Sequence, residues 1–223
     1  MNILALDTST EACSVAIWSD GAVTDRFEYG TQHSERILAL VDELLAESGF
    51  ALARFDAIAL GRGPGSFTGL RIGAGVAHGL AFGADIPVTP VSSLAALAQG
   101  MDAQRVLAAF DARMNQVYSG AYVKNAQGIV ELVGNESVAA PLDVTLPEGN
   151  DWVGAGNGWD QYHVALLQRL GNRVADWRKQ VHPRARDVAQ LGAVAVQAGQ
   201  AIAAEQALPV YVRDDVAVKQ TKA

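Results

Sequence analysis

Three polar residues, Asp7-Thr8-Ser9, follow the apolar run from Ile3 to Leu6, at a point where the chain turns. Carboxylate oxygens are preferred ligands of Mg²⁺ and hydroxyls bind phosphate oxygens, so this turn has the residue types of a metal–phosphate site. The same residue types also close hairpins through side-chain to backbone hydrogen bonds, without any ligand. Asp111-Ala112-Arg113 forms a matching turn after a second apolar run. The candidate nucleotide-binding residues are therefore Asp7, Thr8, Ser9 and Asp111.

A glycine-rich stretch runs from Leu60 to Gly83, LGRGPGSFTGLRIGAGVAHGLAFG, and holds eight of the chain's 22 glycines. Glycine-rich loops often cradle phosphates, but both standard forms are absent from this sequence. A P-loop requires G-x-x-x-x-G-K-[ST], and this stretch contains no lysine. No G-x-G-x-x-G occurs in it either. The glycines therefore do not form a phosphate loop of either type.

The same stretch predicts a helix from Ser66 to Phe82 when its residues are placed at about 100° intervals. Small residues then fall on two stripes: Gly69, Gly73, Ala77 and Ala81 with Ala74 beside them, and Gly75, Gly79 and Gly83. Each interior glycine costs a helix about 1 kcal/mol relative to alanine, so close packing has to offset several kcal/mol. One face can pack on the core of its own lobe. Because polar side chains are scarce, we expect a second face to meet another polypeptide.

Other catalytic signals are absent or ambiguous. The four histidines share no H-x-x-x-H or H-E-x-x-H spacing, which excludes a metal pair on one helix: His33, His78, His163 and His182. Cys13 is the only cysteine, so the chain has no internal disulfide and no cysteine metal cage. The loop VGAGNG, Val153 to Gly158, fits an adenosine-side loop or a plain turn. We identify no catalytic constellation and expect no metal site.

The composition is that of an acidic globular protein. Half of the 223 residues are hydrophobic, and the net charge of −7 argues against free-standing nucleic-acid binding, which needs clustered Lys and Arg. The N-terminal MNILALDTST lacks a basic region and a long apolar run, and no uncharged apolar span reaches the ~20 residues of a membrane helix. We expect a cytoplasmic protein with no membrane partner.

Hydrophobic periodicity predicts an α/β protein. NILALDTSTEACSVAIWSDGAVTDRFEY predicts three strands, with Asp20-Gly21 as a hairpin turn. HSERILALVDELLAESGF predicts a helix that Ser34 caps and Gly49 ends. A strand in FDAIALG precedes the glycine helix, and VTPVSSLAALAQG predicts a short helix opened by Ser92 or Ser93.

The second half repeats the plan of the first, because RVLAAFDARMNQVYSGAYV again reads as strand, Asp, turn, strand. We expect two lobes that meet at Gly100-Met101-Asp102: an N-terminal lobe, residues 1–101, and a C-terminal lobe, residues 102–223, whose last segment can pack back on the first. Helices are expected over Gln161–Leu170 and Asp187–Glu205, and Pro209 begins a final extended piece.

Six segments resemble the TsaB (YeaZ) family of bacterial tRNA-modification proteins: ILALDTSTEACSVAIW, HSERILALVDELL, GPGSFTGLRIG, VTPVSSLAALA, AAFDARMNQVY and PVYVRD. They stand in the right order over essentially the whole chain, and GPGSFTGLRIG is the most specific. The resemblance implies the two-lobed actin-like ATPase and sugar-kinase (ASKHA) fold. It also implies a role in making N6-threonylcarbamoyladenosine beside the anticodon of tRNAs that read codons beginning with A.

The resemblance further implies that the chain is not itself a catalyst. In this family the threonylcarbamoyl transfer is done by the paralogue TsaD, which binds metal through histidines, and the ATPase TsaE joins the pair. The absent histidine pair fits the TsaB side, and tRNA would be held mainly by the partners. The implied pairing surface corresponds to the helices His33–Ser48 and Phe67–Phe82. Its expected interface residues are Ile37, Leu38, Val41, Leu45, Phe67, Leu70, Gly73, Ala74, Ala77 and His78.

Two functions stay open at this point. The first is an activator of a TsaD-type partner. This activator has no cofactor of its own, and the hypothesis is compatible with ATP or ADP bound at the interface with the partner. The second is a nucleotide-dependent phosphotransferase or ATPase of the same fold, using Asp7 and the loops around Asp111 and Gly154. An apolar face meant for a partner also predicts a homodimer when the chain is alone.

Overall fold

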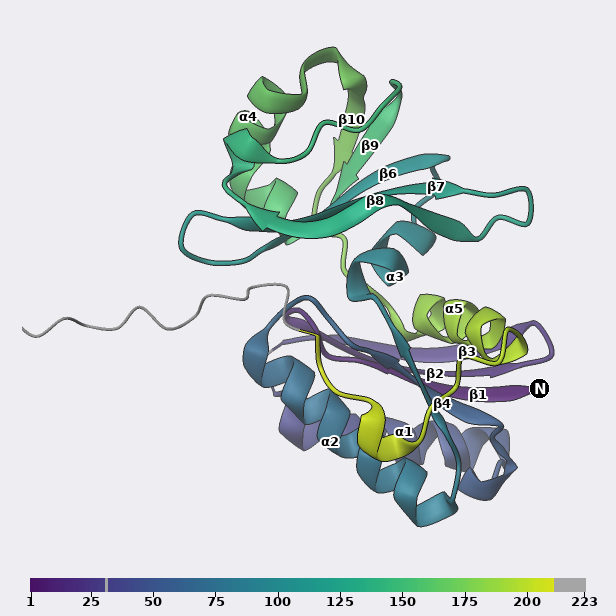
Figure 1. Cartoon of the computed structure of the whole chain (residues 1–223). Helices are drawn as coiled ribbons and strands as arrows, with labels where there is room; N and C mark the ends of the chain where they lie inside the picture. The colour runs from purple at the N-terminus through teal and green to yellow at the C-terminus, as the bar shows by residue number, and fades with distance from the viewer. Residues whose placement is uncertain (31, 211–223) are drawn as a thin grey trace, which may run out of the picture.

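A computed structural model describes residues 1–30 and 32–210, which form two lobes, each with a five-stranded mixed sheet (Figure 1). The strand orders are β3-β2-β1-β4-β5 and β10-β9-β6-β7-β8, so the second sheet repeats the first read in reverse. The first sheet contains β1 (Asn2–Asp7), β2 (Ala12–Ser19), β3 (Ala22–Tyr29), β4 (Ala57–Gly61) and β5 (Val88–Val91). The second contains β6 (Arg105–Asp111), β7 (Val117–Lys124), β8 (Val130–Ala139), β9 (Trp152–Ala155) and β10 (Val174–Arg178). The repeat predicted from the sequence is confirmed, because the two sheets share one strand order.

The helices within the described residues are α1 (His33–Ser48), α2 (Phe67–Ala84), α3 (Ser93–Gln99), α4 (Asn157–Leu170) and α5 (Ala185–Gln197). Helices α1 and α2 cover one face of the first sheet and α5 covers the other (Figure 1). Helix α3 packs on the second sheet from the inner side and touches α5, while α4 covers the outer side of that sheet. Each sheet therefore has helices on both faces, although much of β8 stays exposed, and α3 and α5 lie between the two sheets.

Local signals explain several element ends as predicted. Asp20 and Gly21 have φ angles of 48° and 93°, the positive values that a two-residue turn between β2 and β3 requires. The Ser66 side chain accepts a hydrogen bond from the Gly69 amide at the start of α2, and Ser92 caps α3 in the same way. Gly49 ends α1 in the left-handed conformation.

Helix α1 begins differently from the prediction. Its first residue is His33, after Gln32, and among the described residues no side chain caps it. The predicted cap, Ser34, lies inside the first turn. The start is fixed by a long-range contact instead, because the ring Nε2 of buried His33 lies 2.8 Å from the backbone oxygen of Thr10.

Helix α5 is shorter than predicted. It ends at Gln197 and does not continue to Glu205, because the chain turns at Gly199, whose φ is 71°. Residues 198–210, here called the C-terminal strap, then return to the first sheet, where Ile202 forms an antiparallel bridge with Val88 of β5. The extended piece predicted from Pro209 falls beyond residue 210 for the most part and so outside the described residues.

Helix α5 belongs to the first lobe in space, although it follows the second lobe in sequence. Its Val188 and Ala189 are buried against Ile3 and Ala59 of the first sheet. A methyl group at Gly192 would come within 2.5 Å of the Ala59 Cβ, so the glycine permits the close helix–sheet approach. A division of the chain at residue 101 therefore separates this helix in sequence from the sheet on which it packs.

Asp187 on α5 predicts a pH dependence of stability. Burial raises the pKa of this carboxyl from 3.8 to about 6, although Arg186 and Arg184 act in the opposite direction. The folded state therefore favours the protonated form, and stability that is full below pH ~4 falls as the pH rises through about 6. Replacing Asp187 with Asn should remove this loss. Urea titrations should show the variant gaining up to about 3 kcal/mol over the parent between about pH 4 and pH 8; parallel pH profiles would contradict this assignment.

Candidate functional site

The glycine helix α2 packs one of its small-residue stripes against the turn that follows β1. A methyl group added at Gly69 would lie 2.0 Å from the backbone oxygen of Thr8, and one at Gly73 would lie 2.5 Å from the Thr8 Oγ1. The Thr8 hydroxyl donates a hydrogen bond of 2.7 Å to the Gly69 oxygen. These glycines therefore serve close packing within the first lobe.

This packing corrects part of the predicted partner surface. The following predicted interface residues are buried inside the first lobe: Ile37, Val41, Leu70, Gly73, Ala74 and Ala77. The helical period defined the stripes, but both stripes consist of small residues, so composition did not indicate which one faces the sheet. A partner could reach these six side chains only if the core opened.

The second stripe of α2 is open. Among the described residues, no atom lies within 4 Å of a methyl group built at Gly75, Gly79 or Gly83. Phe67 and Phe82, near the two ends of the helix, are 55% and 78% exposed. A smooth apolar track therefore runs along the outside of α2 between two aromatic rings.

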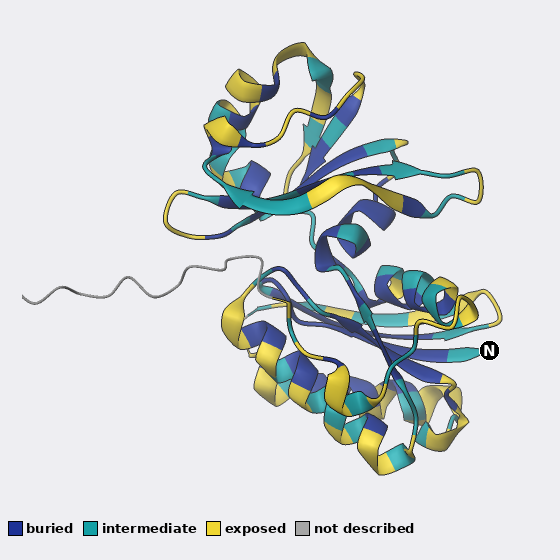
Figure 2. Ribbon diagram, in the orientation of Figure 1, coloured by how far each residue is buried: buried dark blue, intermediate teal, exposed yellow. Residues whose placement is uncertain are grey.

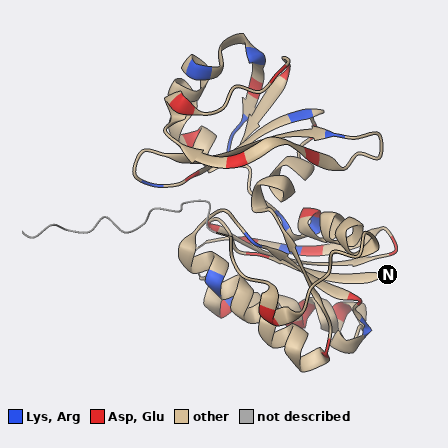
Figure 3. Cartoon of the chain, viewed as in Figure 1, with Lys and Arg blue, Asp and Glu red and all other residues tan. Residues whose placement is uncertain are grey.

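Helix α1 also has an exposed apolar side chain. Leu38 is 48% exposed, whereas Leu45 is partly buried against the core. The outer sides of α1 and α2 stand out as exposed in Figure 2. In Figure 3 α2 is almost free of charge; its only charged residue is Arg71, whose guanidinium lies 3.7 Å over the Phe67 ring. We call Leu38, Phe67, Gly75, Gly79 and Phe82 together the open face.

The C-terminal strap covers another side of α2. The His78 ring Nε2 lies 2.7 Å from the backbone oxygen of Ala207, and the Val210 amide donates to the Arg62 oxygen at 2.9 Å. His78, predicted to be at the interface, is thus half-buried under the chain's own strap. The strap leaves the open face uncovered, because the open-face glycines have free space around them.

Asp7 is enclosed and does not face a cleft. Its side chain is 1% exposed; one carboxylate oxygen accepts hydrogen bonds from the Ser9 amide and hydroxyl, and the other accepts from the Ser93 hydroxyl at 3.1 Å. Burial raises the pKa of this carboxyl, and the bonds from Ser9 and Ser93 oppose that shift. Asp7 therefore ties the first turn to α3, and in this position it has no room for a metal–phosphate group.

A cleft of about 840 Å³ lies between the lobes. Of the four candidate nucleotide-binding residues, Ser9 and Asp111 line it, whereas Asp7 and Thr8 are buried elsewhere. The Asp111 carboxylate accepts a hydrogen bond from the Arg113 amide at 2.8 Å, which is the turn-closing role that its residue type also predicted. Two of the predicted residues thus share one site.

One bridge across this cleft was not predicted from the sequence. The Asn157 side-chain amide donates to the Glu11 carboxylate at 3.1 Å, and 146 residues separate the two. No local motif signals such a pair. Asn157 also lies in VGAGNG, where a methyl group at Gly158 would come within 2.9 Å of the Ala109 backbone. The glycines of that loop therefore let α4 approach β6, which explains them without an adenosine.

Two absences complete the description of residues 1–30 and 32–210. These residues contain no group of three or more His, Cys, Asp or Glu side chains able to hold a metal ion. Within the same ranges, none of the helices has the length and apolar character needed to cross a membrane.

Comparisons with known proteins bear on what this arrangement does. A family model described as TsaD, tRNA N6-adenosine threonylcarbamoyltransferase, matches residues 28–221. A relative from Escherichia coli (strain K12), the tRNA threonylcarbamoyladenosine biosynthesis protein TsaB, is 42% identical, with 99% of this chain and 98% of the relative aligned. The chain belongs to the TsaB (YeaZ) family. A Haemophilus influenzae relative of the same name is 38% identical and aligns over 99% of this chain and 97% of its own.

A solved structure supports the TsaB family at the level of the fold. YeaZ from Pseudomonas aeruginosa superposes with a TM-score of 0.87 at 46% identity, covering 94% of this chain and 99% of that one. The resemblance read from the sequence is confirmed, as is the two-lobed fold it implied. The TsaB relatives are named for tRNA threonylcarbamoyladenosine biosynthesis, which places the chain's family in tRNA modification.

Proposed function

We propose that this chain is a non-catalytic, cytoplasmic subunit of the complex that makes N6-threonylcarbamoyladenosine in tRNA. It pairs with a TsaD-type catalytic paralogue, activates it, and acts with a TsaE-type ATPase. The observation that carries the proposal is the 42% identity, over essentially the full length of both chains, to a relative named TsaB. tRNA reaches the chain within the complex.

The open face supplies a docking surface for the paralogue. Gly75 and Gly79 present bare backbone, and Phe82 projects beside them. Small residues on a helix allow a second helix to approach closely and gain dispersion contacts, and exposed aromatic rings are typical interface anchors. Because such a face is unfavourable in water, we expect it to pair with a second copy when the paralogue is absent.

The phosphotransferase alternative is weaker because its proposed metal ligand is enclosed. Asp7 would have to leave Ser9 and Ser93 before it could reach a Mg²⁺–nucleotide complex. Ser9 and Asp111 still line the cleft between the lobes, so a nucleotide bound there, or ATP or ADP at the partner interface, remains a separate proposal.

Reconstitution tests the proposed function. Cognate TsaD-type and TsaE-type proteins, unmodified tRNA and threonylcarbamoyl-adenylate are combined with and without this chain, and modified adenosines are counted. Allosteric coupling is commonly worth 5- to 150-fold, so we expect an increase of roughly that size when the chain is added. Equal rates with and without it would rule out the activating role. Mg²⁺-dependent hydrolysis of ATP by the chain alone would favour the alternative.

A further inference from the structure

A second cleft, of about 850 Å³, opens between β3 of the first lobe and the α4–β10 side of the second. Its lining is rich in rings, which come from both lobes and from the segment that joins β10 to α5. The rings are Phe27, Tyr29, His163, Trp177 and His182. None of them belongs to the open face, so this cleft is a different surface from the proposed pairing surface.

The rings form two groups. In the first group, the centre of the His182 ring lies 5.2 Å from that of Tyr29 and 6.3 Å from that of Phe27. In the second group, His163 stacks on Trp177, with 4.8 Å between the ring centres and 18° between the ring planes. Tyr29 is 71% exposed, so much of its surface remains free for another planar group. Burial lowers the pKa of His182, which favours the neutral form of that ring.

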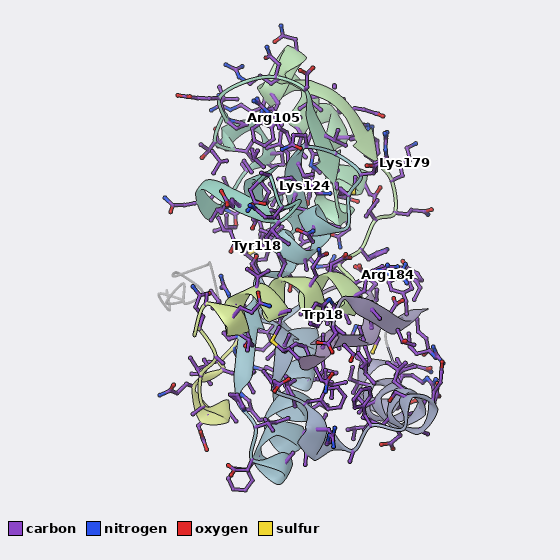
Figure 4. The ribbon with its side chains drawn as sticks, turned by 90° about the vertical axis from the view of Figure 1, so that its right-hand side faces the viewer. Trp18, Arg105, Tyr118, Lys124, Lys179 and Arg184 are labelled. Atoms are coloured by element: carbon purple, nitrogen blue, oxygen red, sulfur yellow. The ribbon has the colours of Figure 1, made fainter. Side chains whose placement is uncertain are left out.

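Each ring group has a cation beside it. The Lys179 ammonium lies 5.4 Å from the centre of a Trp177 ring, and the Arg184 guanidinium lies 5.1 Å from that of Phe27. Arg184 also forms an ion pair of 2.7 Å with Asp25 of β3, which holds its guanidinium beside that strand. Figure 4 shows Lys179 and Arg184 on the same side of the molecule, above and below the junction of the lobes. Lys179 lines the cleft itself, whereas Arg184 lies outside its lining and is already paired with Asp25.

Carboxylates also line the cleft, and each already accepts a hydrogen bond. Glu11 accepts from Asn157, Asp111 from Arg113, and Asp160 from the backbone amide of residue 180 at 3.2 Å. These groups repel a phosphate but can accept from the exocyclic amino group of adenine or cytosine. A nucleotide would accordingly enter with its base toward the carboxylates and its phosphate toward Lys179.

We infer that this cleft binds an unstacked base of a single-stranded RNA segment, stacked on Tyr29, with the adjoining phosphate at Lys179. Aromatic faces flanked by cations are the means by which proteins hold unpaired bases and their backbone. The inference rests on the proposed function, which brings tRNA to this chain. It adds a direct RNA contact to a subunit whose net charge of −7 gives it no general affinity for nucleic acid.

A binding measurement on the full chain tests the inference. The fluorescence anisotropy of a labelled adenine- and cytosine-containing RNA of about eight nucleotides is followed at low salt. Tyr29→Ala should weaken binding about 5- to 150-fold, the range measured for removing one stacking ring, while Tyr29→Phe should bind like the parent. Phe82→Ala is the matched control, because Phe82 is 78% exposed and lies on the open face. Thermal melts establish that each variant is folded.

The outcomes separate this inference from the function on which it rests. Lys179→Ala should flatten the dependence of affinity on salt, and a duplex of the same sequence should bind less tightly than the single strand. Equal affinities for the parent and Tyr29→Ala would overturn the inference, as would tighter binding of a lysine-rich peptide that competes with the RNA. In the reconstituted complex, Tyr29→Ala should raise the KM for tRNA. An unchanged KM in a complex that still depends on this chain would overturn the RNA contact alone.

Discussion

Replacing Gly69 with alanine should lower the free energy of unfolding by about 1–2 kcal/mol. The added methyl group would stand 2.0 Å from the backbone oxygen of Thr8, and backbone on both sides of the contact leaves no flexible side chain to yield. The shift would also disturb the hydrogen bond from the Thr8 hydroxyl to Gly69. Overpacking of this kind typically costs about 1–3 kcal/mol, against which alanine's better helix propensity returns at most about 1 kcal/mol.

Gly79→Ala is the matched control on the same helix. Among the described residues no atom lies within 4 Å of its added methyl group, so the substitution should raise stability by about 0.5–1 kcal/mol. Urea titrations of both variants give the comparison directly. If Gly69→Ala were as stable as the parent, the close approach of α2 to the turn after β1 could not be what the inner glycines provide.

Gly79→Leu should weaken binding to a TsaD-type partner by about 10- to 100-fold and leave the fold intact. The leucine would fill the bare-backbone part of the open face, where a partner helix is proposed to lie closest, and would hold that helix away from α2. Phe82→Asp should act similarly through a different cause, because pairing would bury an unpaired carboxylate. Both positions are exposed in the single chain, so neither change disturbs its core.

Calorimetric titration with the partner measures these effects. Val164→Asp serves as the control, because Val164 on α4 is exposed and lies on the other lobe. Sedimentation of the chain alone extends the test, since the same two variants should be more monomeric than the parent if copies pair through the open face. Full partner affinity in Gly79→Leu would exclude the open face as the pairing surface.

The sequence predicted those parts of the fold that local chemistry specifies. The Asp20-Gly21 turn needs two positive φ angles, and Ser66 and Ser92 have side chains that cap helices, so each could be placed from its neighbours alone. The repeat was visible because both halves open with a strand, an aspartate and a turn. Helix ends that depend on contacts with residues far away in the sequence could not be predicted. Helix α1 begins where His33 meets Thr10, and α5 ends where the chain turns back toward β5.

The candidate site was predicted less completely, for the same reason. Small residues on both sides of α2 fit a core and an interface equally, so the sequence did not show that six of the predicted interface positions are buried within the first lobe. Asp7 has the residue type of a metal ligand, and only the positions of Ser9 and Ser93 show that its carboxylate is already occupied. The contact between Glu11 and Asn157 joins the two lobes, and the hydrophobic periodicity of the sequence gives no signal for such a contact.

The position of α5 has a consequence for synthesis on the ribosome. The strands of the second sheet are contiguous from Arg105 to Arg178, whereas the first sheet lacks its α5 cover until about 100 further residues have followed Val91. At 5–20 residues per second that delay is about 5–20 s, during which Ile3 and Ala59 have no partner helix. The half that is translated first is therefore the half that finishes later. A nascent chain stopped after Arg178 would contain all the strands of both sheets but would lack the α5 cover of the first.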